Sequence, residues 1–206
     1  MGMKNAAFGI RMHSGWGVVV CVSGDYAAPE IVERRRIVIV EPAMPGAKQP
    51  YHFAESLVFE EAEHHLRKCA EISQRLAWNA IGEMLDAVCA RNNRVLGCAM
   101  LVASGRALPP LPKILASHNL VHTAEGEFFR EAVRDAWRRR RVPVVDFRER
   151  ELDGRAKAAF GKAAARVRQR ISDFGKTVGS PWTQDEKIAT LAGLLACGEF
   201  ARSCPV

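Results

Sequence analysis

The sequence contains no apolar stretch near the roughly 18 residues that a membrane-spanning helix requires, so the chain is not expected to cross a bilayer. It has 6 cysteines but no Cys-x-x-Cys pair, and most of the cysteines lie in apolar runs, where a free thiol behaves as a small hydrophobic side chain. This usage favours a reduced chain over a disulfide scaffold. Without a secretory signal or a myristoylation motif, we expect a cytoplasmic protein.

Aromatic residues are scarce, at 7% of the chain, and none is interleaved with the basic residues in the way that stacks single-stranded bases. Positive charge, in contrast, is abundant and concentrated. Residues 134–176 carry 14 Lys and Arg against 6 Asp and Glu, whereas the rest of the chain carries 16 and 17. This basic third predicts a nucleic-acid or other polyanionic partner, with a solvated basic face as the alternative. Its densest parts are the run Arg138, Arg139, Arg140 and Arg141, and the later positions Lys157, Lys162, Arg166 and Arg170.

The apolar pattern predicts a single α/β domain over residues 1–206. Residues 6–40 predict three antiparallel strands, with a β-branched run at 18–22, and residues 51–53 a short fourth strand. The continuous apolar run in residues 94–105, bounded by a basic residue and a glycine, indicates a strand buried on both faces, as in a parallel sheet, and 142–147 is a second such strand. Helices are expected over 54–91, 113–141 with an interruption near Thr123, 155–174 and 183–197. The order of elements predicts a mixed sheet with helices on both faces.

One face of the expected helix at 54–91 carries an apolar stripe at spacings of three and four. His65 lies beside it and is interpreted as a structural residue. The stripe comprises Ala62, Leu66, Cys69, Ile72, Leu76, Ala80, Met84 and Val88. Such a helix also leaves open a scaffold protein that forms homo-oligomers through it.

The first hairpin resembles that of the RuvC-type Holliday-junction resolvases of the RNase H-like superfamily. Those proteins open with a strand ending Gly-Ile-Asp, a turn of small residues and then Gly-Tyr-Gly-Val. Here Gly9-Ile10 is followed by His13-Ser14 and by residues 15–18, Gly-Trp-Gly-Val. The segment from Trp182 is similar to the last helix of that family, in which an Asp precedes small apolar residues. The resemblance implies an RNase H-like mixed sheet: three antiparallel strands, then strands alternating with helices.

The departures from the family concern its catalytic acids. Nucleases of this superfamily surround two divalent metal ions with carboxylates. Arg11 replaces the acid of the first strand, the strand in residues 94–105 has no acid, and only Asp185 matches an expected carboxylate. Because a guanidinium repels cations, the resemblance predicts that the usual metal chemistry is lost.

Residues 117–132 form a polar cluster whose role the sequence leaves open. His118, His122 and Glu125 fall within an arc of roughly 60° on a helix, a spacing that suits a metal or a catalytic group. Alternatively, Thr123 caps a helix that starts there and Glu125 favours its first turn.

The resemblance also implies that the carboxyl ends of the first and fourth strands meet. Arg11, His13 and Arg106 are then expected near His118, His122 and Glu125, in one pocket that suits an anion at least as well as a metal. Three functions follow. The first is a non-nuclease module that binds nucleic acid or another anion. The second is a hydrolase-like enzyme using the histidine cluster with His13, and the third is the scaffold. No cofactor or metal is identified from the sequence.

Overall fold

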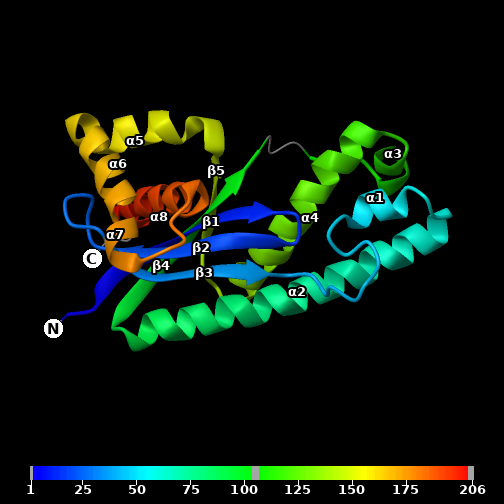
Figure 1. The fold of residues 1–206 in the computed structure, drawn as a ribbon, viewed down its shortest axis with the longest axis horizontal. Helices are drawn as coiled ribbons and strands as arrows, with labels where there is room; N and C mark the ends of the chain where they lie inside the picture. Colours follow the sequence, from blue (N-terminus) through cyan, green and yellow to red (C-terminus); the bar gives the residue numbers. More distant parts are fainter. Residues whose placement is uncertain (1, 104–106, 204–206) are drawn as a thin grey trace.

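The structure, a computed structural model, describes residues 2–103 and 107–203 and contains a five-stranded mixed sheet (Figure 1). The strands β1 (Lys4–His13), β2 (Trp16–Ser23) and β3 (Glu30–Val38) form an antiparallel meander. β4 (Asn93–Val102) pairs parallel with β1, and β5 (Val144–Arg148) pairs parallel with β4, giving the order β3-β2-β1-β4-β5. The predicted mixed α/β sheet is therefore confirmed.

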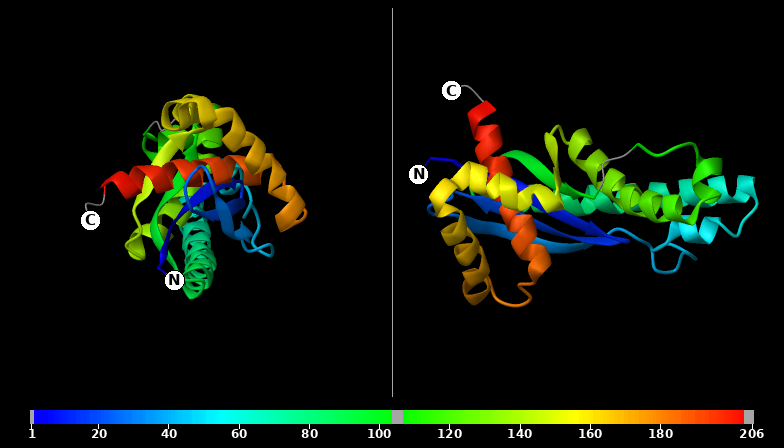
Figure 2. Two further views of the ribbon diagram at one scale, coloured as in Figure 1. Left: turned by 90° about the vertical axis from the view of Figure 1, so that its left-hand side faces the viewer. Right: turned by 90° about the horizontal axis from the view of Figure 1, so that it is seen from above.

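Helices cover both faces of this sheet (Figures 1 and 2). One face packs against α2 and α4, and the other against α5, α6 and α8. Among the described residues the helices are α1 (Pro50–Ala54), α2 (Phe59–Ala90), α3 (Leu111–Leu115), α4 (His118–Arg139), α5 (Leu152–Phe160), α6 (Ala164–Asp173), α7 (Gly175–Val178) and α8 (Gln184–Ser203), with short 3-10 turns at Glu149–Glu151 and Gly161–Ala163. None of these helices is long and apolar enough to cross a bilayer.

Alternation along the central strands sends side chains into two cores. On β1, Phe8 and Ile10 join the core under α2 and α4, while Ala7 joins the core under α8. On β4, Met100 faces the first core and Leu101 the second. Burial on both faces explains why β4 reads as a continuous apolar run.

Helix α8 crosses β1 at backbone distance. A Cβ atom at Gly9 would lie 1.8 Å from the carbonyl oxygen of Ala189, so only glycine fits there. Gly193 contributes to the same approach, because a Cβ built on it would lie 3.2 Å from the backbone nitrogen of Gly9. The small residues of α8 are therefore part of the close packing between helix and sheet.

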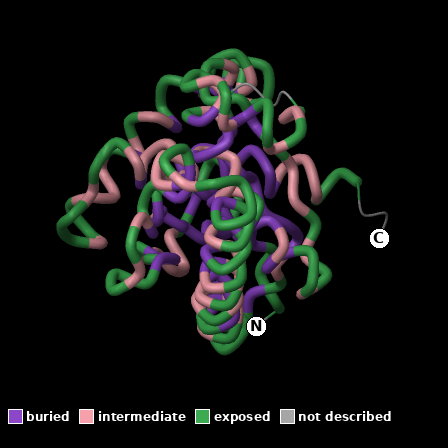
Figure 3. Tube along the Cα trace, turned by 90° about the vertical axis from the view of Figure 1, so that its right-hand side faces the viewer, coloured by how far each residue is buried: buried purple, intermediate pink, exposed green. Residues whose placement is uncertain are grey.

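The amino-terminal parts of α2 and α4 extend beyond the sheet, together with α1 and α3 (Figure 1). Figure 3 views the molecule from that side, with the chain coloured by burial. Two small apolar clusters hold this helical extension: one around Ala54 and Leu66, the other around Ile114 and Val121. The strand predicted at 51–53 was wrong, since these residues belong to α1. Pro50 stands at the start of that helix, where its fixed φ angle and missing N–H are tolerated.

The observed helices differ from the expected ones at several ends. The long helix begins at Phe59, not residue 54, and its buried stripe passes through Ser73, Ala77 and Ile81 in place of the predicted Ile72, Leu76 and Ala80. Successive steps of four residues drift by about 40° around a helix, which moves such a stripe off the buried face. The helix expected at 155–174 is broken at Gly161, whose φ is 52°. The last helix continues to Ser203.

Thr123 does not begin a helix, which corrects its expected role as a cap. α4 starts at His118 and continues through Thr123, whose Oγ1 donates to the carbonyl of Asn119 at 3.0 Å. A Thr hydroxyl inside a helix commonly bonds the carbonyl four residues earlier. The predicted cap at Thr183 is confirmed, because its Oγ1 accepts from the N–H of Asp185 at 3.2 Å, and the carboxylate of Glu186 accepts from the N–H of Thr183 at 2.8 Å.

Candidate functional site

The residues expected in one polar pocket lie in two clusters. Arg11 and His13 meet at the end of β1, whereas His118, His122 and Glu125 lie in the helical extension against α1. Arg106 falls outside the described residues. The single pocket expected from the sequence is therefore divided, because α4 presents the two histidines to His52 of α1 and not to the end of β1.

Arg11 is surrounded by carboxylates at the edge of the sheet. Its guanidinium forms an ion pair with Asp185, and it also binds Glu149 through Nη2 at 3.0 Å and Nε at 3.2 Å. His13 approaches the other oxygen of Asp185 at 2.8 Å and stacks on Trp16 with ring centroids 4.2 Å apart. Asp185 is 16% exposed and Arg11 25%, so the pairing is largely shielded from water. Arg11 thus occupies the space between the two acids.

Local structure brings these groups together. Asp185 lies in the first turn of α8, where the helix dipole favours a carboxylate. Glu149 directly follows β5, at the carboxyl end of a parallel strand. Glu149 was not among the site residues expected from the sequence, although a carboxylate just after a predicted parallel strand is a signal that could have found it.

A cleft of about 900 Å³ opens beside Arg11, between the ends of β1, β4 and β5 and the side of α4. Its polar lining is mostly cationic. Arg130 pairs with Glu127 at 3.0 Å and Arg148 with Glu151 at 3.2 Å, while Arg150 forms no ion pair with a described residue. The cleft is lined by Arg11, Met12, His13, Leu101, Val102, Ala103, Ala107, Leu108, Leu120, Thr123, Arg130, Arg148, Glu149 and Arg150.

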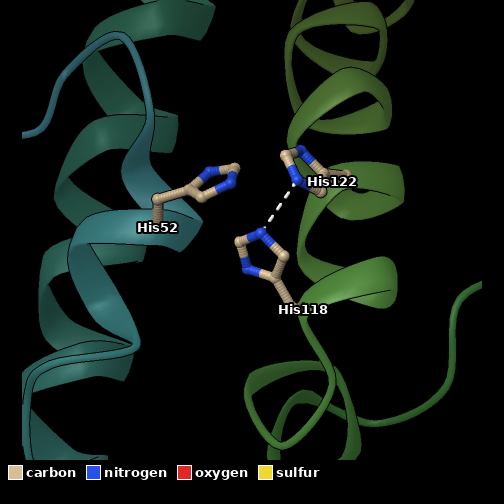
Figure 4. A group of neighbouring side chains, drawn as sticks. All are labelled: His52, His118 and His122. Carbon is tan, nitrogen blue, oxygen red and sulfur yellow. Dashed lines mark hydrogen bonds between the residues drawn. The ribbon is translucent and has the colours of Figure 1, made fainter.

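The second cluster contains three histidines, one of which the sequence analysis missed. His52 of α1 faces His118 and His122 of α4 (Figure 4), and one ring nitrogen of each lies within 4.8 Å of the others. The Nε2 atoms of His118 and His122 are 3.1 Å apart. His52 is 66 positions from His118 in the sequence, so no spacing rule connects them, and its segment was interpreted as a strand.

Glu125 lies behind His52 and does not face the other two rings directly. Its Oε2 accepts the Nδ1–H of His52 at 2.8 Å and the backbone N–H of the same residue at 3.3 Å. Burial raises the pKa of the Glu125 carboxyl, and the hydrogen bonds from His52 partly offset that rise. Its Oε1 is buried without a hydrogen-bond partner among the described residues.

The basic run Arg138 to Arg141 is only partly available to a ligand. Arg140 lies over the ring of Trp78 at 3.8 Å and donates to the carbonyl of that residue at 3.0 Å. Arg139 contacts the same ring at 4.7 Å, and Arg138 pairs with Glu131 at 2.9 Å. Two of the four arginines therefore hold the end of α4 on α2. Arg138, Arg139 and Arg141 nevertheless remain well exposed.

A buried ion-pair network lies on α4 before that run. Arg134, 9% exposed, binds Glu127 at 3.0 Å, Glu131 at 2.6 Å and Asp146 of β5 at 3.0 Å. Burial opposes the ionised form of Glu127, but hydrogen bonds from Arg130 and Arg134 outweigh it and lower the pKa of that carboxyl. Burial also opposes the charge of Arg134, and its bonds to the carboxylates raise its pKa nonetheless. This network stabilises the α4–β5 contact.

The remaining titratable cluster, His65 with Cys69, fits the structural role predicted for His65. His65 packs on the ring of Phe53 at 4.5 Å, and burial, followed by the nearby His64 and Lys68, lowers its pKa. Its Nε2 is 3.5 Å from Cys69 Sγ, but burial raises the pKa of that thiol to about 11. A neutral thiol is a poor nucleophile. The described cysteines are all free.

No family model and no curated protein matches this sequence. The structure is similar to T. thermophilus RuvC in complex with Holliday junction substrate, with a TM-score of 0.51 and 13% identity over 96% of this chain and 95% of that one. A second structure, of Thermus thermophilus RuvC, gives a TM-score of 0.48 at 13% identity over 95% and 96%. With the sheet order and the helices on both faces, the first comparison establishes the RNase H-like fold that the sequence predicted.

Proposed function

We propose that this chain is an RNase H-like module that binds the phosphate backbone of nucleic acid without cleaving it. The observation that carries this proposal is the position of Arg11 between Asp185 and Glu149. Hard divalent ions need free carboxylate oxygens, and here one guanidinium engages both acids and cancels one of their two negative charges. The cleft beside Arg11 is also lined by Arg130, Arg148 and Arg150, which favours an anionic ligand.

A second set of cations supports backbone binding. Lys157, Lys162, Arg166 and Arg170 lie on α5, α6 and the turn between them, and none forms an ion pair with a described residue. Cations without a carboxylate partner are available to phosphates, whereas Arg139 and Arg140 are held by Trp78. The similar structure of T. thermophilus RuvC is a complex with a Holliday junction substrate, so branched DNA is the first polyanion to test.

The experiment is a binding titration by fluorescence anisotropy, with duplex and four-way DNA over a series of salt concentrations. The variant Lys157→Ala with Arg166→Ala removes two exposed cations. We expect its slope of log K against log salt to become shallower by about 1.8, since each phosphate contact on B-DNA contributes about 0.9. The matched control is Lys68→Ala with Arg75→Ala, two exposed cations on α2, across the sheet.

Two results would overturn the proposal. One is no binding at about 50 mM salt, where phosphate contacts are strong. The other is cleavage of either DNA with Mg²⁺ or Mn²⁺ that is lost in Asp185→Asn, because the acids at Arg11 would then hold a metal. An equal loss of binding in the α2 control would assign the effect to net charge and reject the α5–α6 surface.

The structure gives less support to the two other functions, a scaffold and an enzyme that uses the histidine cluster. A self-associating scaffold would need a free apolar face, but the stripe of α2 is used within this chain against the sheet and α4. An enzyme built on His118, His122 and Glu125 would need His52 as well, because Glu125 is directed at that ring.

A further inference from the structure

The histidine cluster has the arrangement of ligands around a single cation. His118 and His122 are one turn apart on α4 and present their Nε2 atoms 3.1 Å from each other. His52 approaches from α1, and its ring centroid lies 4.6 Å from that of His122 and 5.5 Å from that of His118. All three rings point into the same space (Figure 4).

Two carboxylates contact the outer nitrogens of these rings. Glu125 accepts the Nδ1–H of His52 at 2.8 Å, which leaves the lone pair of His52 on Nε2. Glu55 lies 3.6 Å from Nδ1 of His118, whose Nε2 faces His122. Histidines that bind metals commonly donate their other N–H to a carboxylate, which fixes the tautomer and makes the ligating nitrogen more basic.

The distance between His118 and His122 fits a tetrahedral zinc ion. Two nitrogens bound to a tetrahedral zinc ion at about 2.0–2.1 Å lie about 3.3 Å apart, close to the 3.1 Å between the rings of His118 and His122. Neutral imidazole is a favoured ligand of zinc, whereas magnesium and calcium prefer oxygen. We propose that His52, His118 and His122 form a zinc site, with Glu125 and Glu55 as positioning residues.

The site would join α1 to α4 in the helical extension. α1 has five residues, and the apolar cluster that holds it contains only Ala54, Ala62 and Leu66 as fully buried members. A metal bond from His52 would add a contact that this small core does not provide. Three protein ligands leave the fourth zinc position open, and it faces solvent because His118 is 65% exposed. None of this depends on nucleic-acid binding.

The test uses the full chain without a histidine tag, stripped with chelator and then dialysed against zinc. We expect one zinc ion per chain by elemental analysis and a higher melting temperature with zinc. His122→Ala should lose both effects, since two ligands bind poorly. Glu125→Gln should weaken binding by about 10- to 100-fold, the usual effect of removing such a carboxylate. His64→Ala, an exposed histidine on α2, is the matched control and should behave as wild type.

Cobalt substitution identifies the ligands. Among the described cysteines four are buried and Cys89 is exposed, so Cys89 is the thiol that could compete for the metal. A thiolate-to-cobalt absorption band would show that the metal is bound by cysteine and would overturn the proposal. Zinc well below one ion per chain in wild type, or full binding in His122→Ala, would also overturn it and leave the 3.1 Å contact as a hydrogen bond between two imidazoles. If His122→Ala lost its circular-dichroism spectrum, the exposed His118→Ala would replace it.

Discussion

Helix α4 carries two polar faces of opposite character. His118, His122 and Glu125 fall within an arc of roughly 60°, and Thr123, Glu127, Arg130 and Arg134 fall within another on the other side. The first face meets α1 and collects imidazoles backed by carboxylates. The second borders the cleft and β5, and collects guanidinium groups.

The difference shows that the partner element decides what a polar residue does. Glu125 and Glu127 are two positions apart, yet burial raises the pKa of Glu125 while two arginines lower that of Glu127. We call these the histidine face and the arginine face, defined by the seven residues above.

The largest effect is expected on the arginine face, from Arg134→Met. Removing this buried cation breaks its ion pairs with Glu127, Glu131 and Asp146. We expect a loss of about 3 kcal/mol in the free energy of unfolding, the lower end for a broken buried pair, because two of the acids are half exposed. Urea unfolding measures it. The control Arg138→Met shares Glu131 but is 62% exposed, and should cost at most about 1 kcal/mol. Equal losses would contradict the contrast.

The second effect concerns the histidine face and rests on the proposed zinc site. Zinc at about 100 times its dissociation constant should raise the free energy of unfolding by about 2.7 kcal/mol. We expect the same increment in Arg134→Met, since the two faces share no partner in the described contacts and independent sites add to within about 0.5 kcal/mol. Urea curves with and without zinc test this. A clearly smaller increment in Arg134→Met would show that the faces are coupled.

The third effect is an acid sensitivity of Glu127. Its pKa is lowered in the folded state, so its contribution is present above the unfolded pKa, near 4.5, and is lost as the pH falls through the lower folded value. Glu127→Gln should therefore flatten the pH dependence of unfolding below about pH 4.5. Glu60→Gln, exposed at the start of α2, is the control. If the pH dependence of unfolding in Glu127→Gln matched that of the wild type, the pairing of Glu127 with the arginines would not be the source of the acid sensitivity.

The smallest effect is expected from Thr123→Ala. Thr123 lies inside α4, and its hydroxyl bonds a carbonyl of its own helix. The change should stay within about 0.5 kcal/mol, the usual range for such positions. Thr183→Ala removes a genuine helix cap and should cost about 1 kcal/mol. If the two costs were reversed, α4 would begin at Thr123, as the sequence suggested.

The sheet was predictable because its pattern is local. The β-branched run in β2 and the continuous apolar run in β4 both reflect burial on two faces, which composition reveals directly. Helix ends were less predictable, because they depend on which residue finds a backbone partner. By residue type both Ser117 and Thr123 suit a helix cap, and the extended backbone of Ser117 marks the true start of α4, although its side chain makes no capping hydrogen bond.

The candidate sites were predictable only in part. Arg11 and Asp185 could be paired through the family resemblance, and the structure places them together. His52 could not be placed by spacing, because it meets α4 across a long sequence separation through α1. Glu149 was open to prediction from its position directly after β5, although its pairing with Arg11 also spans a long separation. The arginine run was misleading for the opposite reason. A run of arginines predicts a solvated or ligand-binding surface, but Trp78 engages two of its members, Arg139 and Arg140.

The glycine where α8 crosses β1 affects more than packing. Gly9 is two residues before Arg11. The carbonyl of Ala189 packs against Gly9, and Ala189 is four residues after Asp185. The absence of a side chain at Gly9 thus sets how near the guanidinium and the carboxylate come. A methyl group there would push the helix outward and lengthen an ion pair it never touches. The electrostatics of this edge are therefore determined in part by a residue that carries no charge, no polarity and no side chain.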